Sequence, residues 1–380
     1  RRVMRIAFHA PLKPPNHPVP SGDRRMARLL ILALRRAGHL VTIASTLRSY
    51  EGEGDSGRQA AIRRRAARIA QSYIKKSPKT GGPDLWFTYH LYHKAPDLLG
   101  PVVSEALAVP YVVAEASFAP KQVDGPWRCG HGDVQKALRH AARVITLNPN
   151  DAPCVRDVVD DDRRMAALAP FVDTRSTPSA SHDRAKHRAD LAQRHGLNPD
   201  APWIVIAAML RQGDKSDSYR ILAGVLQRLR ETPLQLLVAG DGPARAAIQA
   251  NFNGDPRVCW LGETSAPDVD AIHDAADLVV WPAVREAYGM ALLEAQAAGV
   301  PVIAGGTPGV RQIVAHGETG IIVPSDSPNL EADMATATAA LLQDPDRRRA
   351  MGRTALVRAQ THHGLDDASH HLNYILENLT

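Results

Sequence analysis

Two carboxylates, Glu286 and Glu294, stand eight residues apart, one in a loop and one inside a helix-like run. The run, residues 290–298, is almost wholly Ala, Leu and Met, which is typical of a helix buried on all sides. A buried carboxylate is costly unless it accepts hydrogen bonds, and the paired hydroxyls of a ribose suit it well. The alternatives are that Glu294 pairs with an arginine of the same domain, or that the helix is less buried.

The loop before this helix offers backbone groups as well as a carboxylate. Residues 285–289 follow the strand-like run "DLVVWP", and we expect the helix to begin near residues 289–290. Because the first N–H groups of a helix have no partner within it, they favour an anionic ligand. Glu286 would stand beside that ligand, together with the N–H groups of Ala287, Tyr288 and Gly289.

Glycine-rich turns follow two other strand-like runs. "LLVAGDGPARAAIQA" reads as strand, turn with Gly240 and Gly242, and helix, and "VIAGGTPGVRQIV" repeats the pattern with Gly305 and Gly306. Glycine lets the backbone approach a ligand closely, and the following helix N-terminus favours phosphate. Either turn alone is also compatible with an ordinary strand-to-helix connection.

The elements that position these residues alternate along the chain. With 380 residues and 44% hydrophobic content, the chain is long enough for two cores. Five strand-like runs alternate with helical segments up to about residue 150, a polar stretch spans 176–202, and six more apolar runs follow. Residues 329–380 are helical by periodicity. The pattern predicts two α/β halves with parallel sheets, whose ligands bind beyond the carboxyl ends of the strands.

Composition narrows the class of protein. A net charge of +6 and a pI near 9.3 favour anionic ligands. The three cysteines, Cys129, Cys154 and Cys259, lack the spacing of a zinc site or a disulfide framework, so we expect a reducing compartment and no metal. No signal-peptide core and no apolar run of about 20 residues is found, so we expect a cytoplasmic protein, with peripheral attachment to the inner face of the cell membrane left open.

The segment Trp281–Pro324 resembles the donor-site region of GT-B glycosyltransferases, in particular family 4. Its signature is Glu, seven residues and Glu, followed by a Gly/Pro-rich loop and "GETG". The similarity continues through "VAGDGPAR" and "HDAADLVVWP" and covers most of residues 203–325. It implies a GT-B fold, in which two Rossmann-like α/β domains face each other across a cleft. It also implies that Glu286 lies against the donor sugar and that Glu294 binds the nucleotide ribose.

The family also holds the donor diphosphate with an Arg and a Lys that follow the first strand of the second domain. Here "WIVIAAMLRQGDKSDSY" supplies Arg211 and Lys215. Such cations would neutralise charge on the leaving diphosphate without a metal. Their spacing is four where the family has five, and Ala-Met-Leu stands in place of a Gly, which affects the Arg assignment more than the Lys. The alternative is a solvated loop pair.

The first half is less similar to the family. Where the family carries a Gly-rich turn that meets the donor phosphate, "PVPSGDRR" has the single Gly22, with Ser21 or Asp23 as the cap of the next helix. His90 stands where family members have a His near the acceptor cleft, although a lone His is often structural. The His that the family has after the next strand is replaced by Ala116, so no general base is assigned and an unusual acceptor is expected.

A strongly basic segment, Arg58–Lys76, carries Ile62, Ile69 and Tyr73 along one helical stripe. One interpretation is an interfacial helix on anionic lipid. The other is a solvated helix that packs its narrow stripe on the sheet. Nucleic acid is not an expected partner, because aromatic residues make up only 5% of the chain and none alternates with the arginines.

The resemblance therefore implies a retaining, metal-independent hexosyltransferase without a cofactor. Its domains would be 1–172 on the acceptor side, 173–365 for the nucleotide sugar, and a terminal helix, 366–380, that returns to the first. A UDP- or GDP-sugar would be the donor, and a cell-envelope glycan, a glycolipid or a small molecule the acceptor. The alternatives are a nucleotide-sugar epimerase of the same architecture and a noncatalytic sugar-nucleotide-binding or membrane-scaffolding protein.

Overall fold

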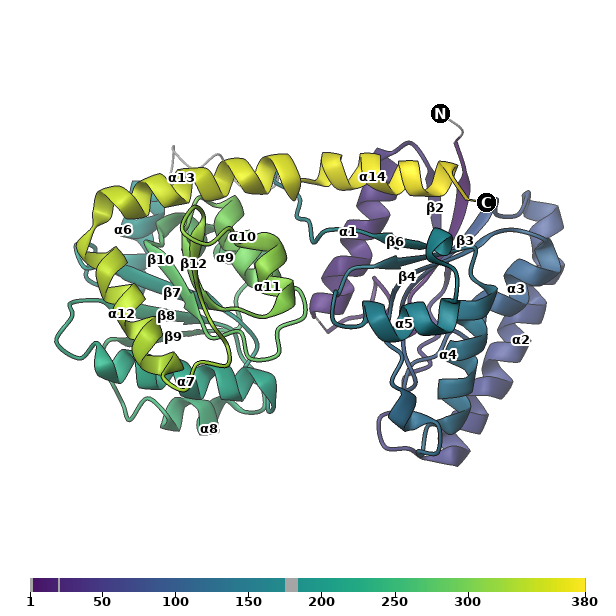
Figure 1. The fold of residues 1–380 in the computed structure, drawn as a ribbon, viewed down its shortest axis with the longest axis horizontal. Helices are drawn as coiled ribbons and strands as arrows, with labels where there is room; N and C mark the ends of the chain where they lie inside the picture. Colours follow the sequence, from purple (N-terminus) through teal and green to yellow (C-terminus); the bar gives the residue numbers. More distant parts are fainter. Residues whose placement is uncertain (1–2, 20, 175–183, 380) are drawn as a thin grey trace. The chain divides into compact units, whose positions relative to one another are not determined.

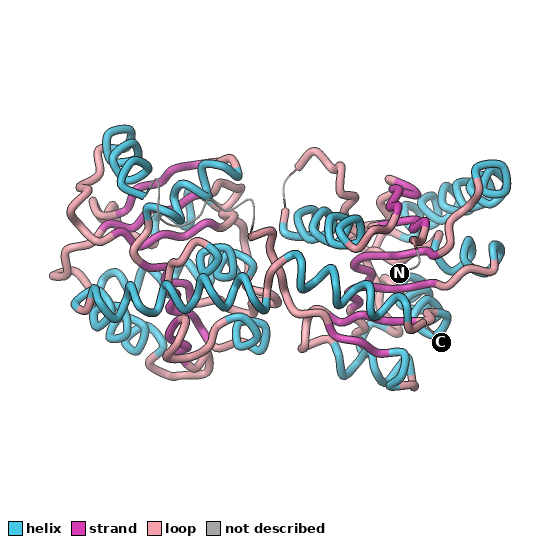
Figure 2. The backbone as a smooth tube through the Cα atoms, turned by 90° about the horizontal axis from the view of Figure 1, so that it is seen from above, coloured by secondary structure: helices cyan, strands magenta, loops and turns pink. Residues whose placement is uncertain are grey.

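The computed structural model describes residues 3–19, 21–174 and 184–379, so part of the polar stretch that follows residue 175 lies outside the described residues. The chain forms two compact units. The first comprises Arg1–Ala169 and Leu365–Thr380, and the second Pro170–Gly364. In each unit, helices lie on both sides of the strands (Figure 2).

In its described residues, the first unit contains one sheet of six strands in the order β2-β1-β3-β4-β5-β6, and every pair is parallel (Figure 1). The strands are β1 (Arg5–His9), β2 (Leu40–Ser45), β3 (Leu85–Leu91), β4 (Tyr111–Ala116), β5 (Arg143–Thr146) and β6 (Met165–Ala167). The helices are α1 (Gly22–Arg36), α2 (Ser56–Thr80), α3 (Gly100–Leu107), α4 (Arg128–His140), α5 (Ala152–Val159) and α14 (Leu365–Glu377). The sequence predicted five of these strands. It missed β6, whose three residues are too few to show a periodicity.

The described part of the second unit also forms one parallel sheet of six strands, in the order β12-β11-β10-β7-β8-β9. These six strands were predicted, and they are β7 (Trp203–Ala207), β8 (Gln235–Ala239), β9 (Val258–Gly262), β10 (Leu278–Trp281), β11 (Val302–Gly305) and β12 (Gly320–Val323). The helices are α6 (Arg184–His195), α7 (Asp214–Arg228), α8 (Arg245–Ala250), α9 (Ala266–Ala275), α10 (Met290–Ala297), α11 (Pro308–Ile313), α12 (Leu330–Gln343) and α13 (Pro345–His362).

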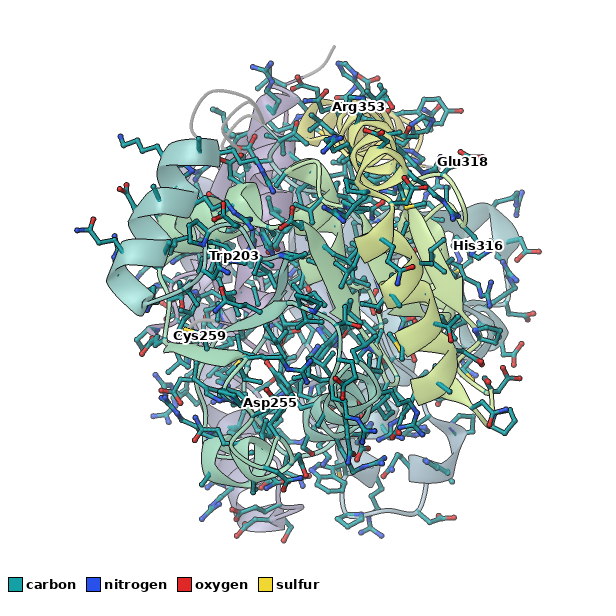
Figure 3. All side chains as sticks on the ribbon, turned by 90° about the vertical axis from the view of Figure 1, so that its left-hand side faces the viewer. Trp203, Asp255, Cys259, His316, Glu318 and Arg353 are labelled. Atoms are coloured by element: carbon teal, nitrogen blue, oxygen red, sulfur yellow. The ribbon has the colours of Figure 1, made fainter. Side chains whose placement is uncertain are left out.

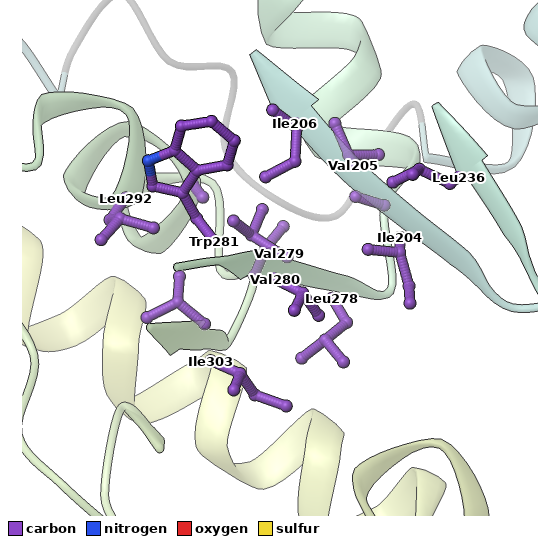
Figure 4. Packing of buried hydrophobic residues seen from close by; sticks show 14 of the residues in the cluster. Ile204, Val205, Ile206, Leu236, Leu278, Val279, Val280, Trp281, Leu292 and Ile303 are labelled. Atoms are coloured by element: carbon purple, nitrogen blue, oxygen red, sulfur yellow. The ribbon is translucent and has the colours of Figure 1, made fainter. Parts of the chain in front are cut away.

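The central strands of the second unit are covered on both faces. Side chains of β7 and β10, such as Ile204 and Val279, pack with Leu292 of α10 in a continuous apolar core (Figure 4). Strands buried on both faces read as unbroken apolar runs, which explains why these strands were recognisable in the sequence. Charged side chains such as Glu318 and Arg353 are exposed at the surface (Figure 3).

Helix α2 contains the basic segment. Two of the three residues in its apolar stripe pack on its own unit: Ile69 and Tyr73 contact the buried core, and the Tyr73 ring lies 5.4 Å from that of Trp86. Arg64 and Arg65 are exposed. The structure thus has the packed stripe of the second interpretation, and it leaves charge rather than apolar surface on the outside of this helix.

Helix α14 packs against α1 within the first unit. Its Leu372 and Leu376 are buried, and Asp366 accepts a hydrogen bond from Arg36 of α1 at 2.7 Å. Across the described residues, no helix combines the length and the apolar composition that a membrane crossing requires. The fold class predicted from the sequence, α/β with two Rossmann-like domains, is confirmed.

Candidate functional site

The strand order of the second sheet places two predicted residues together. Strand β7 lies between β8 and β10, so the connections that follow β7 and β10 diverge there, and residues at the carboxyl ends of these strands meet. Lys215 lies in the first turn of α7, after β7, and Glu286 lies in the loop after β10. Lys215 Nζ donates to Glu286 Oε2 at 2.6 Å, and each side chain is 20% exposed. The site therefore contains a partly desolvated lysine–carboxylate pair.

Trp281, the last residue of β10, supports this pair. Lys215 Nζ lies 5.4 Å from the centroid of the Trp281 ring, within the range of a cation–π interaction. The indole N–H also donates to Glu286 Oε2 at 3.5 Å. Lys215 and Trp281 line a small pocket together with Ala291 and Leu292 from the start of α10. Lys215 thus borders a hollow at the carboxyl end of the sheet.

The loop that carries Glu286 is held in an unusual conformation. Ala283 and Arg285 have φ values of 54° and 48°, in the left-handed region, which costs about 1–2 kcal/mol for each non-glycine residue. Contacts on both sides hold it there: the N–H of Val284 donates to Ser218 Oγ at 3.0 Å, and Thr307 Oγ donates to the carbonyl of Glu286 at 3.0 Å. The position of Glu286 is therefore fixed by its backbone as well as by Lys215.

Helix α10 is less buried than its composition predicts. It begins at Met290, as expected, with Gly289 as its N-cap. Leu292, Leu293 and residues 295–298 are buried, whereas Met290, Ala291 and Glu294 are only half-buried. The expectation of a helix buried on all sides is wrong, because the face with Glu294 is not fully covered by the core. A half-buried carboxylate still reaches solvent and ligands, so its role as a ribose ligand stays a prediction.

Close packing explains the glycines of the turns in the second unit. A Cβ on Gly240 would lie 2.0 Å from the carbonyl oxygen of Ala208, and one on Gly242 would lie 2.3 Å from that of Leu210. The sequence analysis did not single out Gly309, where a Cβ would lie 1.8 Å from the carbonyl oxygen of Ala287. Its signal was present in "TPGV", a glycine just inside a helix start. The packing of these turns suffices to require glycine, and phosphate contacts at Gly240 and Gly242 stay predictions.

Arg211 and Lys215 are in different environments. Arg211 is exposed, and no hydrogen bond or ion pair among the described residues joins it to Glu286, whereas the preceding residue, Leu210, is fully buried. Leu210 stands five residues before Lys215, which is the spacing that the family has between its Arg and its Lys. The structure brings Lys215 into the site with Glu286, and the role of Arg211 stays a prediction.

The first unit also has a pair of charged side chains, Asp23 and His90, at the carboxyl edge of its sheet. Strand β1 lies between β2 and β3, and the residues that follow β1 and end β3 meet at the carboxyl edge. Gly22 and Asp23 begin α1, with Ser21 as the N-cap, which accepts the N–H of Arg24. The Oδ1 atom of Asp23 lies 2.8 Å from Nδ1 of His90. His90 is therefore part of an acid–imidazole pair rather than a lone histidine.

The surroundings of this pair shift both pKa values. Burial lowers the pKa of His90, but the hydrogen bond and charge of Asp23, together with the charges of Glu115 and Asp151, outweigh burial and raise it above its ordinary value. Burial raises the pKa of Asp23, but the hydrogen bond and charge of His90 outweigh burial and lower it. Both shifts favour a charged pair.

The sequence analysis missed the two other carboxylates near His90. Glu115 is buried at φ 63° and accepts the N–H groups of Leu147 and Asn148, each at 3.1 Å. Asp151 accepts from Ser117 Oγ at 2.9 Å. The available signal was position, since Glu115 lies near the end of β4, and Asp151 follows β5.

Aromatic rings extend from His90 along the edge of the first unit. The centroid of His90 lies 5.8 Å from that of Tyr92, Tyr92 lies 5.2 Å from His93, and His93 lies 5.7 Å from Trp127. Lys94 Nζ lies 4.1 Å from the centroid of a Trp127 ring. His93, Lys94 and Trp127 line a second small pocket, at which rings could stack on a flat ligand. Within the part of the chain that is described, no three His, Cys, Asp or Glu side chains gather as metal ligands.

The whole architecture matches solved glycosyltransferases of the GT-B fold. Sucrose-phosphate synthase from Thermosynechococcus elongatus superposes with a TM-score of 0.74 at 20% identity, over 100% of this chain and 99% of that chain. Anabaena Alr3699/HepE, whose structure contains UDP-glucose, gives a TM-score of 0.71 at 15% identity, over 99% and 100% of the chains. The fold is GT-B.

The similarity to a known family lies within the second unit. Residues 201–344 match the family model "Glycosyl transferases group 1", so this part of the chain is similar to that family. This confirms the resemblance that the sequence motifs indicated; assignment to family 4 in particular stays a prediction.

Curated relatives are similar over part of their length. D-inositol 3-phosphate glycosyltransferase of Pseudarthrobacter chlorophenolicus is 33% identical over 228 residues, covering 58% of this chain and 52% of the relative. Alpha-D-kanosaminyltransferase of Streptomyces kanamyceticus is 29% identical over 228 residues, covering 58% of this chain and 56% of the relative. The aligned part of the chain thus spans about half the length of the curated relatives that it matches.

Proposed function

We propose that this protein is a glycosyltransferase that moves a hexose from a nucleoside-diphosphate sugar to an acceptor, with retention of configuration and without a metal. The observation that carries the proposal is the Lys215–Glu286 pair at 2.6 Å, placed after two neighbouring strands in the region that matches the group 1 glycosyl transferase model. A UDP-sugar or a GDP-sugar is the proposed donor. The complexes of Alr3699/HepE with UDP and UDP-glucose support a donor of this kind.

Lys215 has the chemistry to stabilise a leaving diphosphate. Its ammonium group carries three donors, so it can retain Glu286 and also bind a phosphate oxygen. A fixed cation in a partly desolvated site stabilises charge that develops on the departing group. The N–H groups of residues 287–289, just before α10, add donors. Glu286 then positions the donor sugar, and Glu294 accepts from the ribose hydroxyls.

The first unit is the proposed acceptor side. The raised pKa of His90 favours an imidazolium held by Asp23. This imidazolium would donate a hydrogen bond to an oxygen of the acceptor substrate rather than abstract its proton. Gly22 lies at the N-terminus of α1, where N–H groups add further donors. A hydroxyl-rich glycan, a glycolipid or a small molecule fits these groups. We assign no general base.

Contact with anionic lipid is a further part of the proposal. The exposed arginines of α2, such as Arg64 and Arg65, favour an acidic surface. Because Ile69 and Tyr73 are packed inside the unit, the contact would be electrostatic and weakened by salt. Pelleting with vesicles that contain anionic lipid, at low and high salt, tests this part separately.

A donor panel tests the function directly. The unfolding temperature of the chain is measured with UDP, GDP, ADP and their hexose conjugates, since a ligand that binds only the native state raises that temperature. We expect one nucleoside diphosphate to stabilise the chain selectively, and its sugar conjugate to be consumed when a sugar or lipid acceptor is added. Binding without turnover on any acceptor would favour a noncatalytic binding protein. Isomerised sugar without transfer would favour an epimerase.

A further inference from the structure

A second ion-pair cluster joins the Glu286 loop to α7. The guanidinium of Arg285 donates to Asp214 Oδ1 at 2.5 Å and to Asp217 Oδ2 at 2.9 Å. Both acids lie in the first turn of α7, where they also interact favourably with the positive end of the helix dipole. A guanidinium presents several N–H donors in a rigid plane, so it can hold two carboxylates in one geometry. Arg285 therefore bridges two positions on one helix.

These contacts interleave with the Lys215–Glu286 pair. Lys215 lies between the two aspartates on α7, and Glu286 directly follows Arg285 in the loop. Two consecutive loop residues of opposite charge thus make ion pairs with the same turn of α7: Arg285 with the two aspartates, and Glu286 with Lys215. Movement of either segment would disturb both contacts.

The backbone of Arg285 gives the cluster a specific role. Arg285 has a φ of 48°, which side-chain-bearing residues rarely adopt without support from their surroundings. The direction of Glu286 depends on this angle, because Glu286 is the next residue along the chain. If the side chain of Arg285 were released, the loop could relax toward an ordinary φ and turn Glu286 away from Lys215.

We infer that Arg285, held by Asp214 and Asp217, is a positioning residue that presents Glu286 and Lys215 to the donor. This inference rests on the proposed function for its effect on turnover. The ion pairs themselves are exposed: the side chain of Arg285 is 65% exposed, and those of Asp214 and Asp217 are 50% and 42% exposed. Exposed ion pairs add little to global stability, so the cluster orders the loop without supporting the fold as a whole.

The first variants are Arg285→Ala, Arg285→Lys and the double change of Asp214 and Asp217 to Asn, made in the full chain. Arg228→Ala is the matched control, because Arg228 is an exposed arginine at the other end of α7 that pairs with Glu331 at 2.7 Å. Hydrogen exchange of the peptide over residues 283–293 reports loop order. Affinity for the stabilising nucleoside diphosphate, kcat and KM report function.

We expect Arg285→Ala to speed exchange in residues 283–293 at least about threefold and to lower kcat/KM about tenfold, with an unchanged unfolding temperature. Arg285→Lys should recover part of the loss, since one ammonium cannot hold both carboxylates in the same geometry. Combining Arg285→Ala with the two Asn changes should add little, because all three break one cluster. Arg228→Ala should change none of these readouts.

Unchanged exchange in residues 283–293 after Arg285→Ala would overturn the inference, whatever the activity. Faster exchange with unchanged nucleotide affinity and unchanged kcat/KM would also overturn it, because the loop would then be ordered by the cluster without consequence for the site. If the wild-type chain binds no nucleoside diphosphate, the proposed function fails instead, and the exchange experiment alone still decides whether Arg285 holds the loop.

Discussion

Both units place an acid–base pair at the carboxyl edge of a parallel sheet, but the helix supplies the basic residue in one unit and the acidic residue in the other. In each, a residue in the first turn of the helix after the unit's first strand meets a residue at the carboxyl end of a neighbouring strand: Lys215 with Glu286 at 2.6 Å, and Asp23 with His90 at 2.8 Å. In the second unit the helix supplies the cation, and in the first it supplies the acid. The fold thus determines where side chains meet, and the residue types determine what they can bind.

The surroundings sharpen this difference. Lys215 lies near the face of Trp281 and makes an ion pair with Glu286. His90 instead faces the charges of Asp23, Glu115 and Asp151. An ammonium group with a carboxylate partner suits a diphosphate, whereas an imidazole among acids suits hydroxyl groups. Under the proposed function, the two edges serve donor and acceptor respectively.

The largest effect is expected from variants that break the Lys215–Glu286 pair. Glu286→Ala and Lys215→Ala should each lower kcat at least about a hundredfold, because each removes a charge that acts on the transferring group. Folding should be largely retained. Glu318→Ala, at an exposed carboxylate of the same unit, is the control. Near-normal turnover in both site variants, with the same fold by circular dichroism, would remove these roles.

A glycine-to-alanine change tests whether packing against α11 determines the conformation of the loop that carries Glu286. Gly309→Ala introduces a Cβ 1.8 Å from the Ala287 carbonyl oxygen, so the loop or α11 must shift. We expect a loss of about 1–3 kcal/mol in the free energy of unfolding, measured in urea, and weaker nucleotide binding. Gly317→Ala is the control for space, because a Cβ there meets nothing within 4 Å, although its φ of 83° carries strain. Equal stability of Gly309→Ala and the wild type would contradict the packing account.

A milder change separates binding from turnover. Glu294→Gln keeps the size of the side chain but removes its charge. Losing one charge-assisted acceptor for the ribose should weaken nucleoside diphosphate binding about tenfold, while kcat changes little. Calorimetric titration and steady-state kinetics measure the two effects. A large fall in kcat with unchanged affinity would place Glu294 at the reacting bond rather than at the ribose.

The smallest expected effect lies in the pH dependence of the first unit. The pKa of His90 is higher in the folded chain than its value of 6.5 in the unfolded chain. The protonated imidazole therefore stabilises the fold fully below pH 6.5, and this contribution is lost as the pH rises through the folded pKa. The pKa of Asp23 is lower in the folded chain than its unfolded value of 3.8. The ionised carboxylate therefore stabilises the fold fully above pH 3.8, and this contribution is lost as the pH falls through the folded pKa. The pair should therefore stabilise most between about pH 4 and 6.5.

Asp23→Asn should lower the pKa of His90, observed by NMR titration of its ring protons, and should flatten the fall in stability above pH 6.5. His17→Gln is the control, at a partly buried histidine in the loop before α1. An unchanged titration of His90 in Asp23→Asn would mean that the pair at 2.8 Å does not control the imidazole.

The sequence predicted the second unit better than the first for physical reasons. Its central strands are buried on both faces and read as apolar runs, and its turns require glycine, so both leave strong patterns. Glu286 was identified in the loop after a visible strand, whereas Lys215 was identified through the family resemblance, which has a Lys after the first strand of the second domain. The first unit has fewer such glycines, and its acids are recognisable only after β3, β4 and β5 are known to be neighbours.

Two features were out of reach for pattern analysis. The half-burial of Glu294 depends on how completely other elements cover α10, which composition does not reveal. The contact of Arg285 with Asp214 and Asp217 spans about 70 residues and depends on a left-handed backbone at Arg285. Such conformations have no signature in a residue that is not glycine.

Calorimetric titration of the wild-type chain and Lys215→Ala with the selected nucleoside diphosphate tests the central claim most directly. The account predicts saturable one-to-one binding by the wild type and at least about tenfold weaker binding by Lys215→Ala, with Arg228→Ala unchanged. Equal affinity in all three proteins, or no saturable binding of UDP, GDP or ADP by the wild type, would contradict it.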